Sequence, residues 1–177
     1  MSLLAGTSRC RLHYVRAQMP TLLTNVHVYR AIAEEAFSEA SRLEVEARRP
    51  KPDGAPGYVI SLDPSRSAFK QSLIAIAFSG VYLEALLFLR GTQRLGDQWL
   101  QEFDRKTYEE KLKHLGVTDE SLIQSAKRLR TVRRELVHEK AAANGNLALG
   151  KNYWAQVEAA EAIALIRNIS SLLEDAP

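Results

Sequence analysis

The feature that most constrains the fold of this chain is a helical pattern from about Ser65 to Arg90. At about 100° per residue, apolar side chains cover nearly the whole circumference of this helix from Leu73 onward. Such a helix is central to a bundle, or is shared between a core and a subunit interface. The pattern therefore predicts a helical bundle built around this segment, and it also favours a homodimer. Glu84 is the one charged residue between positions 73 and 88.

The rest of the chain also carries helical periodicity, with almost no strand signal. A proline- and glycine-rich segment at 50–57 separates the first helical pattern from the others. Residues 58–62 are interpreted as a short extended piece or the entry to the next helix, too isolated to found a sheet. We predict an all-α fold, with an N-terminal arm and helix over residues 1–60 and an up-and-down helical bundle over 63–175. The other helical patterns cover Thr21 to about Arg49, 96–116, 121–140 and 153–173.

Composition narrows the class of protein. The chain has 177 residues, of which 46% are hydrophobic and 25% charged, as in an ordinary soluble globular domain. The net charge of +3 excludes a global polycation, so any affinity for nucleic acid must come from a local patch. The one cysteine, Cys10, excludes an intrachain disulfide and fits a reducing compartment. The apolar run is shorter than the ~20 residues of a membrane span. We therefore expect a cytoplasmic protein without a membrane segment.

The helical pattern at 121–140 contains a conflict. Leu129, Val132 and Leu136 lie on a core-facing stripe, and Arg133 falls near the middle of that stripe. A guanidinium stays charged and is costly to bury unless it is paired and hydrogen-bonded. Glu84 is the natural partner, either as a buried carboxylate or at the rim of a dimer. We predict a structural ion pair between Glu84 and Arg133.

The same helix is strongly cationic, with six lysines and arginines against two glutamates. Arg130, Arg134 and His138 follow one another at four-residue spacing and form a stripe beside the apolar face. The stripe is either a solvated helix flank or a binding surface. The unperturbed pKa of histidine, about 6.5, suits proton transfer at neutral pH, although Arg133 and His138 lie about 140° apart on an ideal helix. Metal-ligand spacings and glycine-rich phosphate loops are missing from the sequence, so we expect no metal and no cofactor.

The segment RRELVHEK at 133–140 contains Arg, four residues, then His. This pattern resembles the signature of HEPN domains (higher eukaryotes and prokaryotes nucleotide-binding), which are small α-helical bundles. The resemblance extends to the order of elements over residues 63–175: an apolar helix with an embedded glutamate, the segment YEEKLKHL at 108–115, the motif helix and a closing apolar helix. The fold that it implies is a bundle of the HEPN type.

The resemblance also implies a function. Catalytic HEPN members are metal-independent endoribonucleases, usually homodimers, in toxin–antitoxin or defence systems. Arg133 and His138 would be the catalytic residues, and Arg130, Arg134 and Lys127 would hold the RNA backbone. Many ribonuclease members have Asn, Asp or His directly after the arginine, whereas this chain has Arg134. The alternatives are a non-catalytic module that binds RNA, a nucleotide or a nucleotidyltransferase-like antitoxin, and an unrelated helical role.

Overall fold

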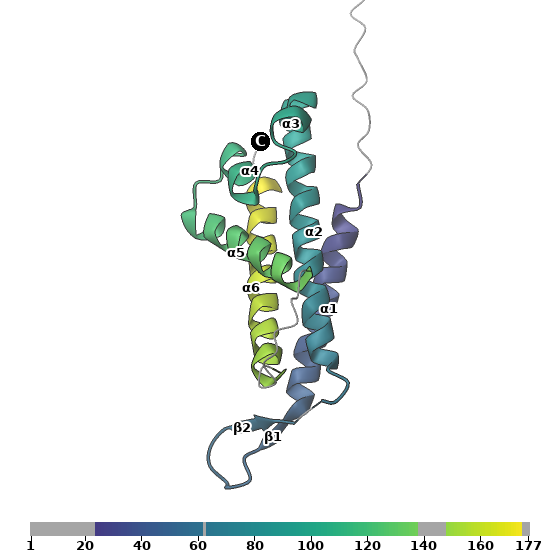
Figure 1. Cartoon of the computed structure of the whole chain (residues 1–177), viewed down its shortest axis with the longest axis vertical. Coiled ribbons are helices and arrows are strands. Elements are labelled where there is room, and N and C mark those ends of the chain that lie inside the picture. The colour runs from purple at the N-terminus through teal and green to yellow at the C-terminus, as the bar shows by residue number, and fades with distance from the viewer. Residues whose placement is uncertain (1–23, 62, 138–147, 175–177) are drawn as a thin grey trace, which may run out of the picture.

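The computed structural model describes residues 24–61, 63–137 and 148–174, which form an all-α bundle with one two-stranded sheet. The predicted all-α class is confirmed, and each expected helical pattern contains at least one helix (Figure 1). The elements are α1 (Val26–Ala47), β1 (Arg48–Pro50), β2 (Tyr58–Ile60), α2 (Ser67–Leu95), α3 (Asp97–Glu102), α4 (Tyr108–His114), α5 (Glu120–Val137) and α6 (Ala148–Glu174).

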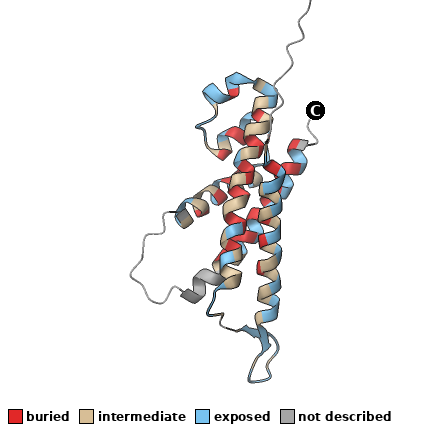
Figure 2. Ribbon diagram, turned by 90° about the vertical axis from the view of Figure 1, so that its right-hand side faces the viewer, coloured by how far each residue is buried: buried red, intermediate tan, exposed pale blue. Residues whose placement is uncertain are grey.

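Three long helices, α1, α2 and α6, lie side by side with α2 in contact with both others (Figure 1). The helices approach closely because small side chains are buried between them, as at Ala33 and Ala36 of α1 and Ala159 of α6. Buried residues line the facing sides of the long helices, and exposed residues line the outer sides (Figure 2). Helix α1, which we assigned to the N-terminal part, therefore shares one hydrophobic core with the 63–175 segment.

The central helix α2 is longer than expected. The sequence pattern predicts that it ends at Gly91, but it continues through Gly91 to Leu95. A Cβ atom at position 91 would lie 2.0 Å from the indole ring of Trp99, which is fully buried. Gly91 therefore makes room for the Trp99 ring, and the chain leaves the helix at Gly96, where φ is +58°.

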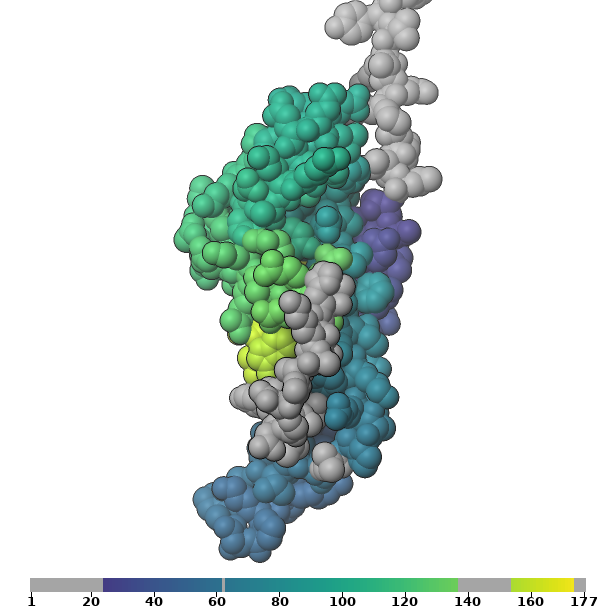
Figure 3. Space-filling model, viewed as in Figure 1, coloured from purple at the N-terminus to yellow at the C-terminus, as the bar shows by residue number. Residues whose placement is uncertain are grey.

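Helix α3 lies at the end of α2, and α4 and α5 lie beside α2 and α6 (Figures 1 and 3). Helix α5 lies across α2 and α6, with Ile123, Ala126 and Leu129 buried against them. Helix α4 packs against both α5 and α2. This arrangement brings the start of α4 and the second half of α5 to the middle of α2, where the candidate site lies.

The expectation that residues 58–62 cannot found a sheet is wrong. Tyr58–Ile60 pairs antiparallel with Arg48–Pro50, with Arg49 opposite Val59. All six strand residues are exposed, and the hairpin projects from the end of the bundle opposite α3 (Figures 1 and 3). The guanidinium of Arg48 lies 4.4 Å from the centre of the Tyr58 ring, a cation–π contact that ties the two strands together.

Among the described residues, α2 has the length and composition of a membrane-spanning helix. Half of its most apolar window is buried inside the protein. A central bundle helix meets the same criteria because it must be apolar on most of its circumference.

Candidate functional site

The candidate site is built around Arg133 on α5. The side chains of Leu129 and Val132 are buried, and Arg133 follows them on the side of α5 that faces α2. The Arg133 side chain is 32% exposed, so its aliphatic part is covered while part of its polar end reaches solvent. The conflict that the sequence pattern predicts is therefore real, and the surroundings of Arg133 resolve it.

Gly80 of α2 provides the space for Arg133. A Cβ atom on Gly80 would lie 2.6 Å from Cδ of Arg133 and 3.3 Å from its Nε. Glycine in a helix interior costs about 1 kcal/mol relative to alanine. This cost is explained by packing, because any larger residue at position 80 would displace the arginine side chain.

Tyr108, the first residue of α4, holds the guanidinium. Nη1 of Arg133 donates a hydrogen bond of 2.8 Å to the Tyr108 hydroxyl, which in turn donates to the carbonyl oxygen of Gly80 at 3.2 Å. Tyr108 is 5% exposed. Burial raises the pKa of the Tyr108 hydroxyl above its ordinary value of 10.0; the Arg133 charge opposes this shift and the Glu84 carboxylate adds to it. Tyr108 is therefore neutral at physiological pH and can donate and accept at once.

The start of α4 is itself fixed by a capping box. The Thr107 side chain accepts a hydrogen bond from the backbone N–H of Glu110, and the Glu110 carboxylate accepts one from the backbone N–H of Thr107. Tyr108 follows directly, so its ring is anchored by a well-ordered helix terminus.

The predicted ion pair between Glu84 and Arg133 is present, with Oε2 of Glu84 3.3 Å from Nη1 of Arg133. It is not buried, however, because the Glu84 side chain is 53% exposed. The alternative of a buried Glu84 is therefore wrong, and its place at the rim of a dimer stays a prediction. The pair therefore resembles a surface ion pair more than a buried one.

Two further arginines of α5 are paired in a different manner. Arg130 binds Glu109 of α4 through both Nε (3.3 Å) and Nη2 (2.8 Å). Burial alone would raise the pKa of Glu109, but the hydrogen bonds and charge of Arg130 outweigh it and lower the pKa below 4.5. Arg128 binds the buried carboxylate of Glu158 on α6 through Nε (2.9 Å) and Nη2.

These pairings divide the cations that we predicted to contact RNA. Arg130 is engaged by Glu109, whereas Lys127 and Arg134 are exposed and their side chains make no hydrogen bond or ion pair within the described ranges. Tyr108 and Glu109 were missed at the sequence level. The capping pattern marks the start of α4, but no periodicity indicates which helix α4 contacts.

His138, the second predicted catalytic residue, lies outside the described residues, one position beyond the described end of α5. Among residues 24–61, 63–137 and 148–174, no group of three His, Cys, Asp or Glu side chains is arranged to hold a metal ion.

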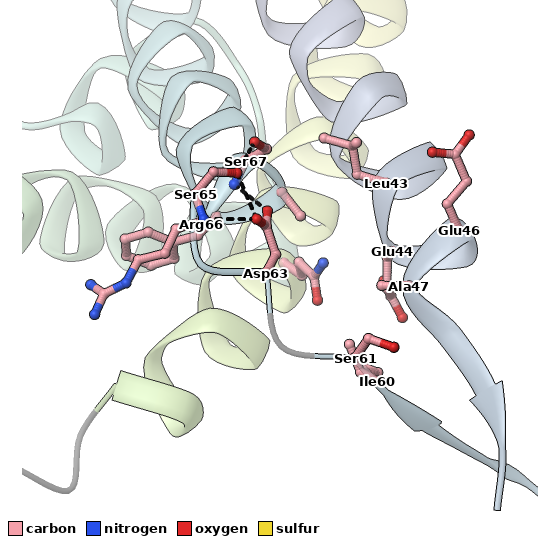
Figure 4. A pocket seen from close by; sticks show the side chains of 13 residues that line it. Leu43, Glu44, Glu46, Ala47, Ile60, Ser61, Asp63, Ser65, Arg66 and Ser67 are labelled. Atoms are coloured by element: carbon pink, nitrogen blue, oxygen red, sulfur yellow. Dashed lines mark hydrogen bonds between the residues drawn. The ribbon is translucent and has the colours of Figure 1, made fainter.

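A cavity lies elsewhere, between the end of α1, the hairpin base and the start of α2 (Figure 4). Its volume is about 440 Å³. Its carboxylates are already engaged: Glu44 pairs with Arg48, Glu46 pairs with Arg42, and Asp63 accepts hydrogen bonds from the first turn of α2. Arg66 also lines the cavity and makes no ion pair within the described residues, and Phe69, another lining residue, lies about 16 Å along α2 from Gly80.

Comparisons of the chain with protein-family models, with curated proteins and with solved structures find no match.

Proposed function

We propose that the protein acts on RNA as a HEPN-like, metal-independent endoribonuclease with Arg133 and His138 as its catalytic residues. The observation that carries the proposal is the arrangement around Arg133. Among the described residues, its guanidinium is bound by Tyr108 and Glu84 through Nη1 alone, in a space that Gly80 leaves open. A charged group that is fixed on one side and free on the other is suited to stabilising negative charge on a substrate.

The chemistry requires no metal because RNA supplies its own nucleophile. The ribose 2′-oxygen attacks the adjacent phosphorus, the bond to the leaving 5′-oxygen breaks, and a 2′,3′-cyclic phosphate forms. His138 would either remove the proton from the 2′-hydroxyl or donate a proton to the leaving oxygen. Arg133 would stabilise the additional negative charge on the phosphorane.

Lys127 and Arg134 would hold the RNA backbone. Both are exposed on α5 and free of ion pairs within the described part of the chain, whereas Arg130 is already bound to Glu109. Contacts of lysine and arginine with phosphate position a nucleic acid without reading its sequence. We therefore expect binding with little base specificity.

The direct test is cleavage of single-stranded RNA in the presence of EDTA. We expect wild type to cut RNA but not the corresponding DNA, which lacks the 2′-hydroxyl. His138→Ala should reduce the rate by about 10²–10⁴-fold, the usual contribution of a positioned general acid or base. The matched control is His27→Ala, since His27 is exposed on α1. Cleavage by His138→Ala at the wild-type rate would contradict the catalytic assignment.

The second candidate is a module that binds RNA or a nucleotide without cutting it. It is favoured by Arg134, which stands where ribonuclease members of the family have a polar Asn, Asp or His. Wild-type protein that binds RNA tightly and leaves it intact in the same assay would establish this alternative. A nucleotidyltransferase-like antitoxin partner and a cytoplasmic location are also proposed, on the resemblance and on composition.

We further propose a homodimer. Helix α2 keeps a stripe of exposed or half-buried apolar residues at helical spacing: Ile74, Ala77, Val81 and Phe88. Glu84 interrupts this stripe beside Arg133, so a second copy packed there would lie next to the candidate site. Sedimentation should give a dimer at micromolar concentration, and a monomer would contradict the proposal.

A further inference from the structure

We infer that Tyr108 is a positioning residue for Arg133: its hydroxyl holds the guanidinium by Nη1, so that the opposite Nε–Nη2 edge is left to bind a phosphodiester. The inference rests on the proposed function for the identity of the ligand. The orientation of Arg133 can be tested without it.

The guanidinium of Arg133 uses only part of its hydrogen-bond donors. A guanidinium donates from Nε, Nη1 and Nη2, and the N–H groups of Nε and Nη2 point in the same direction as a fork. Arg133 makes its hydrogen bonds with Tyr108 and Glu84 from Nη1. Within the described residues, Nε and Nη2 have no partner. The fork that matches two oxygens of a phosphate or carboxylate is therefore unoccupied.

The neighbouring arginines of α5 differ from Arg133 in the edge of the guanidinium that is bound. Arg128 and Arg130 both use the Nε–Nη2 fork, against Glu158 and Glu109. Each of these arginines already satisfies its best bidentate geometry with a carboxylate of the protein. Arg133 is held by its other side, and this difference is not explained by its charge or its position on the helix.

Of the two groups that bind Arg133, the Tyr108 hydroxyl is held more firmly in place than the Glu84 carboxylate. The Tyr108 hydroxyl is closer than Glu84, at 2.8 Å against 3.3 Å. Tyr108 is buried, and its hydroxyl is oriented by the bond to the Gly80 carbonyl, whereas the Glu84 side chain is 53% exposed. A rigid, buried acceptor fixes a guanidinium more effectively than a mobile one, because less side-chain freedom is lost when the contact forms.

The test compares Tyr108→Phe with Tyr82→Phe. Both variants remove one buried hydroxyl and keep the ring. The Tyr82 hydroxyl donates a hydrogen bond of 2.9 Å to Oγ of Ser170 and makes no contact with Arg133 among the described residues. The first measurement is the NMR signal of the Arg133 Nε–H group, assigned by its loss in Arg133→Lys. We expect Tyr108→Phe to broaden or shift this signal and to reduce its response to added inorganic phosphate, while Tyr82→Phe leaves both unchanged.

The second measurement uses a short, fluorescein-labelled, single-stranded RNA of mixed sequence. Misplacing a catalytic group by about 1 Å can cost up to 10²-fold in rate. In a cleaving protein, Tyr108→Phe should therefore lower kcat by about tenfold or more, with little change in KM. In a protein that only binds, it should raise the Kd for RNA. Tyr82→Phe should alter neither quantity beyond what its loss of stability explains.

Gly80→Ala provides a variant that leaves Tyr108 intact. Its Cβ would collide with Cδ of Arg133, so it should displace the guanidinium and reproduce the NMR change of Tyr108→Phe without removing a hydrogen-bonding group. An Arg133 signal that stays at its wild-type position and phosphate response in both variants would overturn the inference. If wild type neither binds nor cuts RNA, the proposed function fails, and the NMR result still decides whether Tyr108 positions Arg133.

Discussion

Two ion pairs on α5 have opposite distributions of burial. In the pair of Arg128 and Glu158, the arginine side chain is 61% exposed and the glutamate only 3% exposed. In the pair of Arg133 and Glu84, the arginine is 32% exposed and the glutamate 53% exposed. In each pair, therefore, the less exposed partner depends more on the contact. For the first pair this is the carboxylate, and for the second it is the guanidinium.

The difference separates a structural pair from a functional candidate. Glu158 is desolvated and needs Arg128 to balance its charge, so Arg128 acts by stabilising the folded protein. Arg133 is supported mainly by Tyr108 and by the space at Gly80, and Glu84 adds a contact that water can replace. The sequence shows both arginines as cations of the same helix, but only their surroundings distinguish their roles.

The largest effect is expected for Arg128→Ala. It leaves the Glu158 carboxylate buried without its partner, which should lower the free energy of unfolding by about 3 kcal/mol. For a chain of this size, the melting temperature should fall by roughly 6–12 °C in a calorimetric scan. The double variant Arg128→Ala with Glu158→Gln should recover much of the loss, because the unpaired charge is gone. If the single variant melts like wild type, Glu158 is not the dependent partner.

Arg130→Ala should have a smaller effect and lower the free energy of unfolding by about 1 kcal/mol at pH 7, because the pair of Arg130 and Glu109 is partly exposed. The pKa of Glu109 is lowered in the folded protein, so its ionised form contributes stability above pH 4.5 that is lost as the pH falls through the folded pKa. Wild type and variant should therefore differ in urea denaturation at pH 7 and converge as the pH falls through the lowered pKa of Glu109. A difference that persists unchanged in acid would show that the Glu109 charge is not responsible.

Glu84→Gln should lower the free energy of unfolding by less than about 1 kcal/mol, because the carboxylate is exposed and Tyr108 continues to hold Arg133. Removal of one partner from a buried pair would instead lower the free energy of unfolding by about 3–5 kcal/mol. Thermal melting with Glu84→Gln and Arg128→Ala side by side gives the comparison. Equal losses in the two variants would remove the distinction between the pairs.

The smallest effect on stability is expected for Lys127→Ala and Arg134→Ala, whose side chains are exposed. Their melting temperatures should match that of wild type. If they contact phosphates as proposed, each substitution should make the dependence of RNA affinity on salt shallower by about one unit of slope on logarithmic axes. Arg128→Ala, after correction for unfolded protein, should leave that slope unchanged.

Much of the fold could be predicted from helical periodicity, because each long helix buries one broad apolar face. The end of α2 could not, since Gly91 resembles a helix stop in sequence and its role depends on the Trp99 ring packed against it. The hairpin was missed for a related reason. Arg48–Pro50 and Tyr58–Ile60 are too short to signal strands individually, and only their pairing defines them.

At the candidate site, the sequence identifies Arg133 and its partner Glu84, since each is a lone charge in an apolar pattern. It does not identify Tyr108, because contact between α4 and α5 depends on how the helices pack. For the same reason the partner of Arg130 was unforeseen, and its predicted contact with RNA stays a prediction. The role of His138 depends on chemistry that only the cleavage assay can test.

The projecting hairpin exposes strand edges through which two molecules could associate in concentrated solution. A two-stranded ribbon has two outer edges whose backbone groups can pair with another chain. On β1, Pro50 offers no N–H group, and the charges of Arg48 and Arg49 would repel their copies in a second molecule. On β2, Tyr58–Ile60 is apolar and exposed, with no such protection. Arg48, Arg49 and Pro50 therefore oppose edge-to-edge pairing only on the β1 side, and the β2 edge is the side through which two ribbons could pair.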